Sequence, residues 1–142
     1  MIIVDTGVLY AAADRTDAYH RVSADLLRTA SEPLVIPITV IVETSFLIER
    51  HLGPKAEAAF LRFLVPSGVV IDRLQDSDLD RMAELVAAYA DLPLGAVDAS
   101  VITVAERLGA SKVYTVDWRH FTVVRPRHVD HFTLSPDVLP RK

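Results

Sequence analysis

Residues 1–7 of the chain read MIIVDTG, an apolar run that ends at an acid. Ile2–Val4 is the kind of short, fully apolar segment that forms a buried strand of a parallel sheet. Asp5 then stands at the carboxyl end of that strand, where an ionised acid is costly unless something neutralises it. The stretch therefore predicts a sheet and a polar site at one of its edges.

Three further acids occupy comparable places. Asp117 follows the apolar run 113–116, and Glu43 and Asp98 fall within about a turn of expected helix starts. The carboxyl ends of neighbouring parallel strands share one edge of a sheet, where ligands bind, but the sequence pattern alone does not establish which strands are neighbours. Carboxylate oxygen is the ligand that Mg²⁺ and Mn²⁺ prefer, so the four acids are candidates for a hard divalent cation site.

Apolar segments along the chain alternate between strand-like and helix-like spacing. Further strands are predicted at 34–36, 69–71 and 113–116, and helices at 8–13, 17–30, 39–51, 54–64, 77–91 and 96–108. Thr39 and Ser77 are the expected caps of two helices. A fifth strand is expected at either 121–124 or 132–134. This alternation predicts a single α/β domain over residues 1–142, with a parallel sheet flanked by helices on both faces.

Composition excludes several classes of protein. The chain has 142 residues, 51% of them hydrophobic, which suits one domain with a real core. It has no cysteine, so disulfides, thiolate metal sites and cysteine nucleophiles are excluded. The first residues show no signal peptide, and the longest apolar stretch, 34–48, is interrupted by Pro37 and Glu43. We therefore expect a cytoplasmic protein without a membrane span.

Charge is distributed unevenly along the chain. Residues 1–111 hold 9 Lys and Arg against 16 Asp and Glu, whereas residues 112–142 hold 6 against 3. A basic C-terminal segment beside an acidic site is suited to gripping phosphates around a metal. The same segment also fits an ordinary solvated surface.

Each of the four acids also has a structural reading. Asp5 can cap a helix, Asp98 can stabilise a helix start, and Asp117 can form an Asx turn. Glu43 can pair with Arg50. The other aspartates are interpreted as caps and solvated faces: Asp14, Asp17, Asp72, Asp76, Asp78, Asp80 and Asp91.

The order and spacing of the acidic motifs resemble those of the PIN domain. The matching motifs are Asp5-Thr6 after the first strand, Glu43 in a central helix, Asp98-Ala99 at the start of a late helix, and Thr115-x-Asp117 after the fourth strand. The length and the start at Met1 resemble the VapC-type toxins of bacterial toxin–antitoxin pairs.

This resemblance implies a strand order of 3-2-1-4-5 and an endoribonuclease that depends on Mg²⁺ or Mn²⁺. The implied catalytic acids are Asp5, Glu43, Asp98 and Asp117, with Asp5, Asp98 and Asp117 as metal ligands and Thr6 and Thr115 in support. The implied partners are an RNA substrate, a second copy of the chain in a homodimer, and a small antitoxin protein that silences it.

An acidic nuclease still needs positive charge to hold RNA. Arg119 and His120 are the first candidates because they directly follow Asp117 and Trp118. Further candidates are Arg125, Arg127 and Arg15. Arginine suits this task because it can bind a phosphate through two hydrogen bonds.

Other readings compete with a nuclease. Asp5-Thr6-Gly7 matches the motif of aspartic proteases, but that chemistry needs two such carboxylates in an all-β fold. A phosphate-receiving binding module also places acids at strand ends, and Thr115 and Lys112 lie on one predicted strand. A catalytically inactive PIN-like domain that only binds a protein partner is the third alternative.

Overall fold

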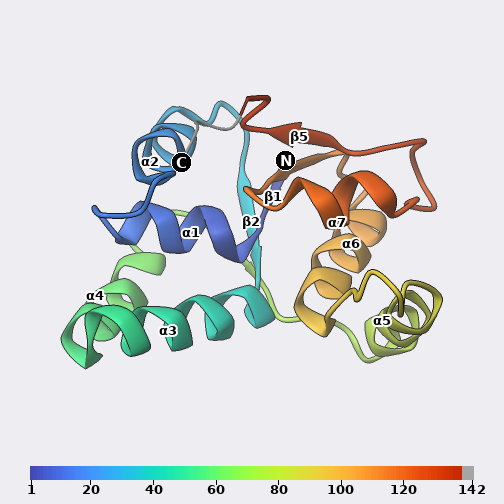
Figure 1. The fold of residues 1–142 in the computed structure, drawn as a ribbon, viewed down its shortest axis with the longest axis horizontal. Coiled ribbons are helices and arrows are strands. Elements are labelled where there is room, and N and C mark those ends of the chain that lie inside the picture. Colours follow the sequence, from blue (N-terminus) through green and yellow to red (C-terminus); the bar gives the residue numbers. More distant parts are fainter. Residues whose placement is uncertain (139–142) are drawn as a thin grey trace.

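The structure of the chain, a computed structural model, describes residues 1–138 (Figure 1). Within them, short strands form one parallel sheet in the order β3-β2-β1-β4-β5. The strands are β1 Ile2–Val4, β2 Leu34–Pro37, β3 Val70–Asp72, β4 Lys112–Tyr114 and β5 Thr133–Ser135. Ile3 stands in register with Val35 on one side and Val113 on the other. The expected strand order is confirmed, and β1 and β4 are neighbours.

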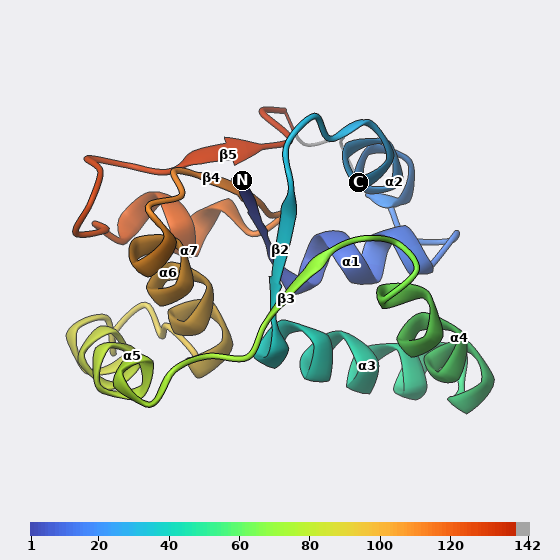
Figure 2. The same ribbon diagram turned by 180° about the vertical axis from the view of Figure 1, so that it is seen from behind.

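Helices cover the sheet on both faces. Figures 1 and 2 show α1 to α4 on one side and α5 to α7 on the other. The helices are α1 Thr6–Ala13, α2 His20–Thr29, α3 Ile38–Leu52, α4 Pro54–Leu64, α5 Asp76–Ala88, α6 Ala96–Leu108 and α7 Trp118–Val123. Within the described residues, no helix combines the length and apolar character needed to cross a membrane.

The helix α6 is the most deeply buried of the helices that carry a predicted site residue. Its residues from Ala99 to Ala105 are all buried, and Val101, Ile102 and Val104 are fully enclosed. Burying each such side chain contributes roughly 1.5–3 kcal/mol to stability. The start of α6, which carries Asp98, is therefore held firmly against the sheet.

The structure decides one expectation that named two segments, and it contradicts two others. Residues 121–124 fall largely in the helix α7, and the fifth strand is the other candidate, β5. The fully buried ring of Phe121 packs edge-on against Phe132, so an apolar run that looked strand-like is the inner face of a short helix. Thr39 does not cap α3, which begins at Ile38; its hydroxyl lies 2.6 Å from that of Ser100. Gln75, rather than Ser77, is the N-cap of α5.

Candidate active site

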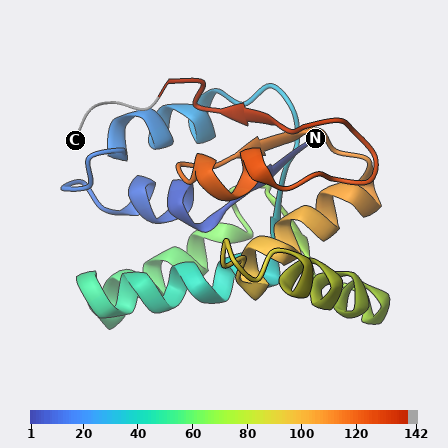
Figure 3. The ribbon, with the colours of Figure 1, turned by 45° about the vertical axis from the view of Figure 1, so that its right-hand side comes forward.

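The four predicted acids meet at the carboxyl edge of the sheet. The first turns of α1, α3 and α6 gather near the end of β1, with α7 beside them (Figure 3). Asp5 lies at the end of β1, Glu43 on α3, Asp98 in the first turn of α6 and Asp117 directly before α7. Asp5 feels the charges of Asp98 and Glu43, and Asp98 feels those of Asp117 and Glu43. The structure thus brings together acids from distant parts of the chain.

Asp5 is the most buried of these acids, with 4% of its surface exposed. Burial first, and then the negative charge of Asp98, raise its pKa to about 7. It occupies the N-cap position of α1 but makes no capping hydrogen bond. Its Oδ2 accepts a hydrogen bond of 2.8 Å from the Thr115 hydroxyl, while its Oδ1 has no partner among the described residues. A buried carboxylate oxygen without a partner is costly, which a cation would relieve.

Thr115 ties two of the acids together. Its buried hydroxyl donates to Asp5 Oδ2 and accepts a hydrogen bond of 2.9 Å from the Asp117 backbone N–H. Thr6, the other predicted supporting residue, is buried beside Asp5, and its hydroxyl has no partner among residues 1–138. Thr115 therefore fixes the start of the loop that carries Asp117.

Gly7 allows this loop to approach α1 closely. A Cβ atom added at Gly7 would lie 2.5 Å from Cγ2 of Val116, which is far inside normal contact distance. Val116 stands between Thr115 and Asp117. The absence of a side chain at Gly7 thus contributes to the spacing between Asp5 and Asp117.

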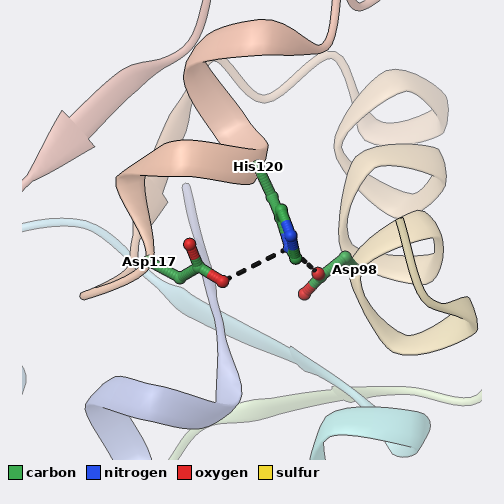
Figure 4. Close-up of side chains that lie close together, drawn as sticks. All are labelled: Asp98, Asp117 and His120. Atoms are coloured by element: carbon green, nitrogen blue, oxygen red, sulfur yellow. Dashed lines mark hydrogen bonds and ion pairs between the residues drawn. The ribbon is translucent and has the colours of Figure 1, made fainter. Parts of the chain in front are cut away.

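His120 is an unexpected member of the acidic cluster. Its Nδ1 lies 2.5 Å from Asp98 Oδ2 and 3.3 Å from Asp117 Oδ2 (Figure 4). The side chains of His120 and Asp98 are each 18% exposed and that of Asp117 is 46% exposed. Burial raises the pKa of Asp98, and the hydrogen bond from His120 opposes that shift. The sequence signal for this contact is the three-residue separation of Asp117 and His120, which puts both on one side of a helical turn.

The donor groups fit a divalent cation. Asp98, Asp117 and His120 each offer a ligand atom, and these atoms all lie within 4.8 Å of one another. Asp5 is not in this group of three, but its Oδ1 has no partner among the described residues and its carboxylate feels the charge of Asp98. Carboxylate oxygen suits Mg²⁺ and Mn²⁺, and imidazole nitrogen suits Zn²⁺, Cu²⁺, Fe²⁺ and Ni²⁺. The residues present therefore match the predicted cofactor class.

The predicted arginines lie outside this cluster. Arg119 is exposed and donates a hydrogen bond of 3.0 Å to the Leu92 carbonyl. Arg127 forms an ion pair of 2.6 Å with Glu84, and its backbone N–H donates to Glu106 in the last turn of α6. Arg125 and Arg15 are exposed, the latter on the loop after α1. Of the five predicted RNA contacts, only His120 lies among the acids.

An apolar patch adjoins Glu43. The patch is a shallow cavity of about 490 Å³ lined by Ile38, Thr39, Val42, Glu43, Phe46 and Val97. Val42 and Phe46 lie on consecutive turns of α3, and 63% and 56% of their surfaces are exposed. Large exposed apolar side chains grouped beside a polar site are typical of an interaction surface.

Known proteins are similar to this chain in sequence and in fold. The family model for the PIN domain matches residues 2–125. A ribonuclease of Mycobacterium tuberculosis, VapC26, is 28% identical over 135 residues, which is 95% of this chain and all of that protein.

Two solved structures are similar in fold. The crystal structure of the sarcin-ricin loop cleaving toxin VapC20 of M. tuberculosis gives a TM-score of 0.79 at 21% identity, covering 84% of this chain and 92% of that one. The structure of VapBC2 from Rickettsia felis, bound to a promoter DNA fragment, gives a TM-score of 0.65 at 16% identity, covering 94% of this chain and 97% of that one.

Proposed function

The chain belongs to the PIN domain family, and on this premise we propose that it is a metal-dependent endoribonuclease and the toxin of a toxin–antitoxin pair. One observation carries the proposal. Four acids converge at the sheet edge, and among residues 1–138 no lysine or arginine forms an ion pair with any of them. Such a site is poised for a divalent cation rather than for an internal salt bridge.

The residues divide the chemistry as follows. Asp5, Asp98 and Asp117 would hold the cation, Mg²⁺ or Mn²⁺, which would neutralise charge on the phosphoryl oxygens and activate water. Glu43, half-buried on α3, accepts a proton from the attacking water at a carboxylate oxygen. Thr115 keeps Asp5 and Asp117 in place through its two hydrogen bonds, and the buried Thr6 directly follows Asp5 in the chain. The new bond between water and phosphorus replaces the bond to the 3′ oxygen, which leaves and takes a proton from water, so the expected products carry 5′-phosphate and 3′-hydroxyl ends.

Similar proteins support RNA as the substrate. VapC26 is named as a ribonuclease, and VapC20 is described as a toxin that cleaves the sarcin-ricin loop. The competing reading as a phosphate-receiving module needs a lysine near Thr115. Lys112 lies at the opposite end of β4 from Thr115, and it forms an ion pair with Glu32, as the N-terminal amine also does.

The test is RNA cleavage by pure protein with and without metal. Cleavage should stop in EDTA, return with Mg²⁺ or Mn²⁺, and leave 5′-phosphate ends when fragments are sequenced. Full activity in EDTA, or 2′,3′-cyclic phosphate products, would refute the proposal. Metal binding without cleavage of any RNA would instead favour the catalytically inactive alternative.

A second copy of the chain is the proposed occupant of the apolar patch on α3. Light scattering should report a dimer, and Phe46→Glu should shift it towards the monomer. Phe63→Glu is the matched control, because Phe63 is 66% exposed on α4 and does not line the patch. A wild-type monomer at tens of micromolar would contradict this proposal and leave the nuclease chemistry open.

The antitoxin is proposed to be a small protein encoded next to this chain, which acts in the cytoplasm. The protein product of the adjacent gene should bind the toxin tightly and suppress RNA cleavage. The support for such a partner is that the structurally similar VapBC2 is described as two proteins that share a promoter. Failure of any adjacent gene product to bind or inhibit would count against the toxin role.

A further inference from the structure

His120 places a nitrogen atom in a site otherwise made of carboxylate oxygens. It stands on α7, and its Nδ1 is within 3.3 Å of oxygens from both Asp98 and Asp117. The proposed function assigns no role to this imidazole, which the sequence indicated only as a candidate RNA contact. Its side chain is only 18% exposed and faces the acids rather than solvent, which suits a ligand better than a phosphate contact.

We propose that Nδ1 of His120 is a ligand of the bound cation and makes the site prefer Mn²⁺ over Mg²⁺. This inference rests on the proposed metal-dependent function. It adds a fourth side chain to the three carboxylates and names the metal that this chain favours.

The geometry already suits coordination. Neighbouring ligands of an octahedral ion lie about 3 Å apart and opposite ligands about 4 Å apart, since each bond is about 2.1 Å long. The distances of 2.5 Å and 3.3 Å from His120 Nδ1 to the two carboxylates bracket the first value. The ligand atoms of all three residues lie within 4.8 Å of one another. A cation that binds there replaces the proton of the hydrogen bond between Nδ1 and Asp98, and that proton moves to Nε2 or to water.

The backbone around His120 is fixed. The next residue, Phe121, is fully buried and packs against Phe132. On the other side, the Asp117 N–H is bound to the Thr115 hydroxyl. The chain is thus held both before and after His120, which keeps the imidazole beside Asp98 and Asp117.

The chemistry of the two candidate ions differs at such a nitrogen. Mg²⁺ is a hard ion that strongly favours oxygen and gives up its water reluctantly. Mn²⁺ is also suited to oxygen ligands, but as a first-row transition ion it gains more from a nitrogen ligand than Mg²⁺ does. An imidazole among carboxylates therefore raises affinity for Mn²⁺ more than affinity for Mg²⁺.

Pulsed electron paramagnetic resonance of Mn²⁺ bound to the wild-type protein tests the ligand directly. The spectrum should show coupling to nitrogen, and the pattern should change when histidine is labelled with ¹⁵N. Both effects should vanish in His120→Asn and persist in His131→Asn, a control at an exposed histidine. The asparagine amide can still donate a hydrogen bond to Asp98, so a residue that only positions this acid would be rescued.

Calorimetric titration gives an independent readout. The ratio of Mn²⁺ to Mg²⁺ affinity should fall about tenfold in His120→Asn, the scale of effects around metal sites. Bound Mn²⁺ without histidine coupling in the wild type overturns the inference and leaves the nuclease proposal standing. A wild-type protein that binds neither ion overturns both.

Discussion

The two ends of α6 lie beside two acidic clusters, and only one of these clusters contains arginines. Near the last turn, Arg107 pairs with Asp72 and Asp78, and Arg81 pairs with Glu106. Near the first turn, the four site acids have no arginine or lysine partner among residues 1–138. We call these the paired cluster and the unpaired cluster.

The same residue type behaves in opposite ways in the two clusters. In the paired cluster, burial acts to raise the pKa of Asp72, but hydrogen bonding to Arg107 leaves that pKa below its usual value. In the unpaired cluster, burial and neighbouring charge raise the pKa of Asp5 to about 7. The paired acids join elements of the fold, whereas the unpaired acids are kept at a cost in stability, which is typical of functional groups.

The largest expected effect is on catalysis. Asp98→Asn should reduce RNA cleavage by about a thousandfold, because metal binding supplies several kcal/mol of transition-state stabilisation. Asp80→Asn, at an exposed acid on α5, should cleave normally. Initial rates at saturating Mg²⁺ would measure this. Equal activity of the two variants would mean that the unpaired cluster is not catalytic.

The next effect is on the pH dependence of stability without metal. The folded pKa of Asp5, about 7, lies above its unfolded value of 3.8, so the folded state holds the proton longer. The free energy of unfolding should therefore fall as pH rises from about 4 to 7, by at most about 4 kcal/mol from this group.

Asp5→Asn removes this titration and should be more stable than the wild type at pH 7. Urea unfolding at pH 4, 5.5 and 7 in EDTA would show both trends. The asparagine can still accept the hydrogen bond from Thr115, so a loss of stability at pH 7 would mean that the Asp5 charge is structural.

A change in the paired cluster should have the opposite character. Arg107→Ala leaves Asp78, 4% exposed, without its charge partner and should lower the free energy of unfolding by about 3 kcal/mol. Cleavage per folded molecule at low temperature should stay close to wild type. An Arg107→Ala variant with normal stability and no activity would mean that the paired cluster serves catalysis rather than the fold.

The smallest expected effect concerns RNA binding. Changing both Arg125 and Arg127 to Ala should flatten the log–log salt dependence of RNA affinity by about 1, from a starting slope of about −2 to −4. The effect is modest because Arg127 is already paired with Glu84, near the paired cluster. Fluorescence anisotropy across a salt series would measure it. An unchanged slope would place the RNA contacts elsewhere, with Arg119 and Arg15 the next candidates.

The main features of the fold were accessible from the sequence because apolar runs are punctuated by acids. The apolar run before Asp5 forms β1, and the run before Asp117 begins within β4. The strand order was expected from the resemblance to the PIN domain, and the structure has this order. The choice between 121–124 and 132–134 for the last strand was not accessible. Runs this short fit a strand or one buried face of a helix equally well.

The site was accessible only in part for a related reason. His120 reaches the acids because α7 is helical, and the sequence left open whether the residues directly after it form a strand. The pairing of Arg127 with Glu84 depends on the path of the chain after α7, which no local pattern encodes. Asp78 was interpreted as a cap or a solvated residue; it does close a capping box on α5, but it is buried against Arg107. Local periodicity carries no information about such distant partners.

The unpaired cluster depends on Gly7, a residue that carries no functional group. A selection for cells that survive expression of the chain should collect substitutions at Gly7 alongside those at the acids, although glycine contributes no chemistry. The lesion would be one of spacing, because a new methyl group must push Val116 and the loop that carries Asp117. It should therefore have a suppressor: Val116→Ala removes the atom in the way, and Gly7→Ala paired with it should restore toxicity that Gly7→Ala alone has lost.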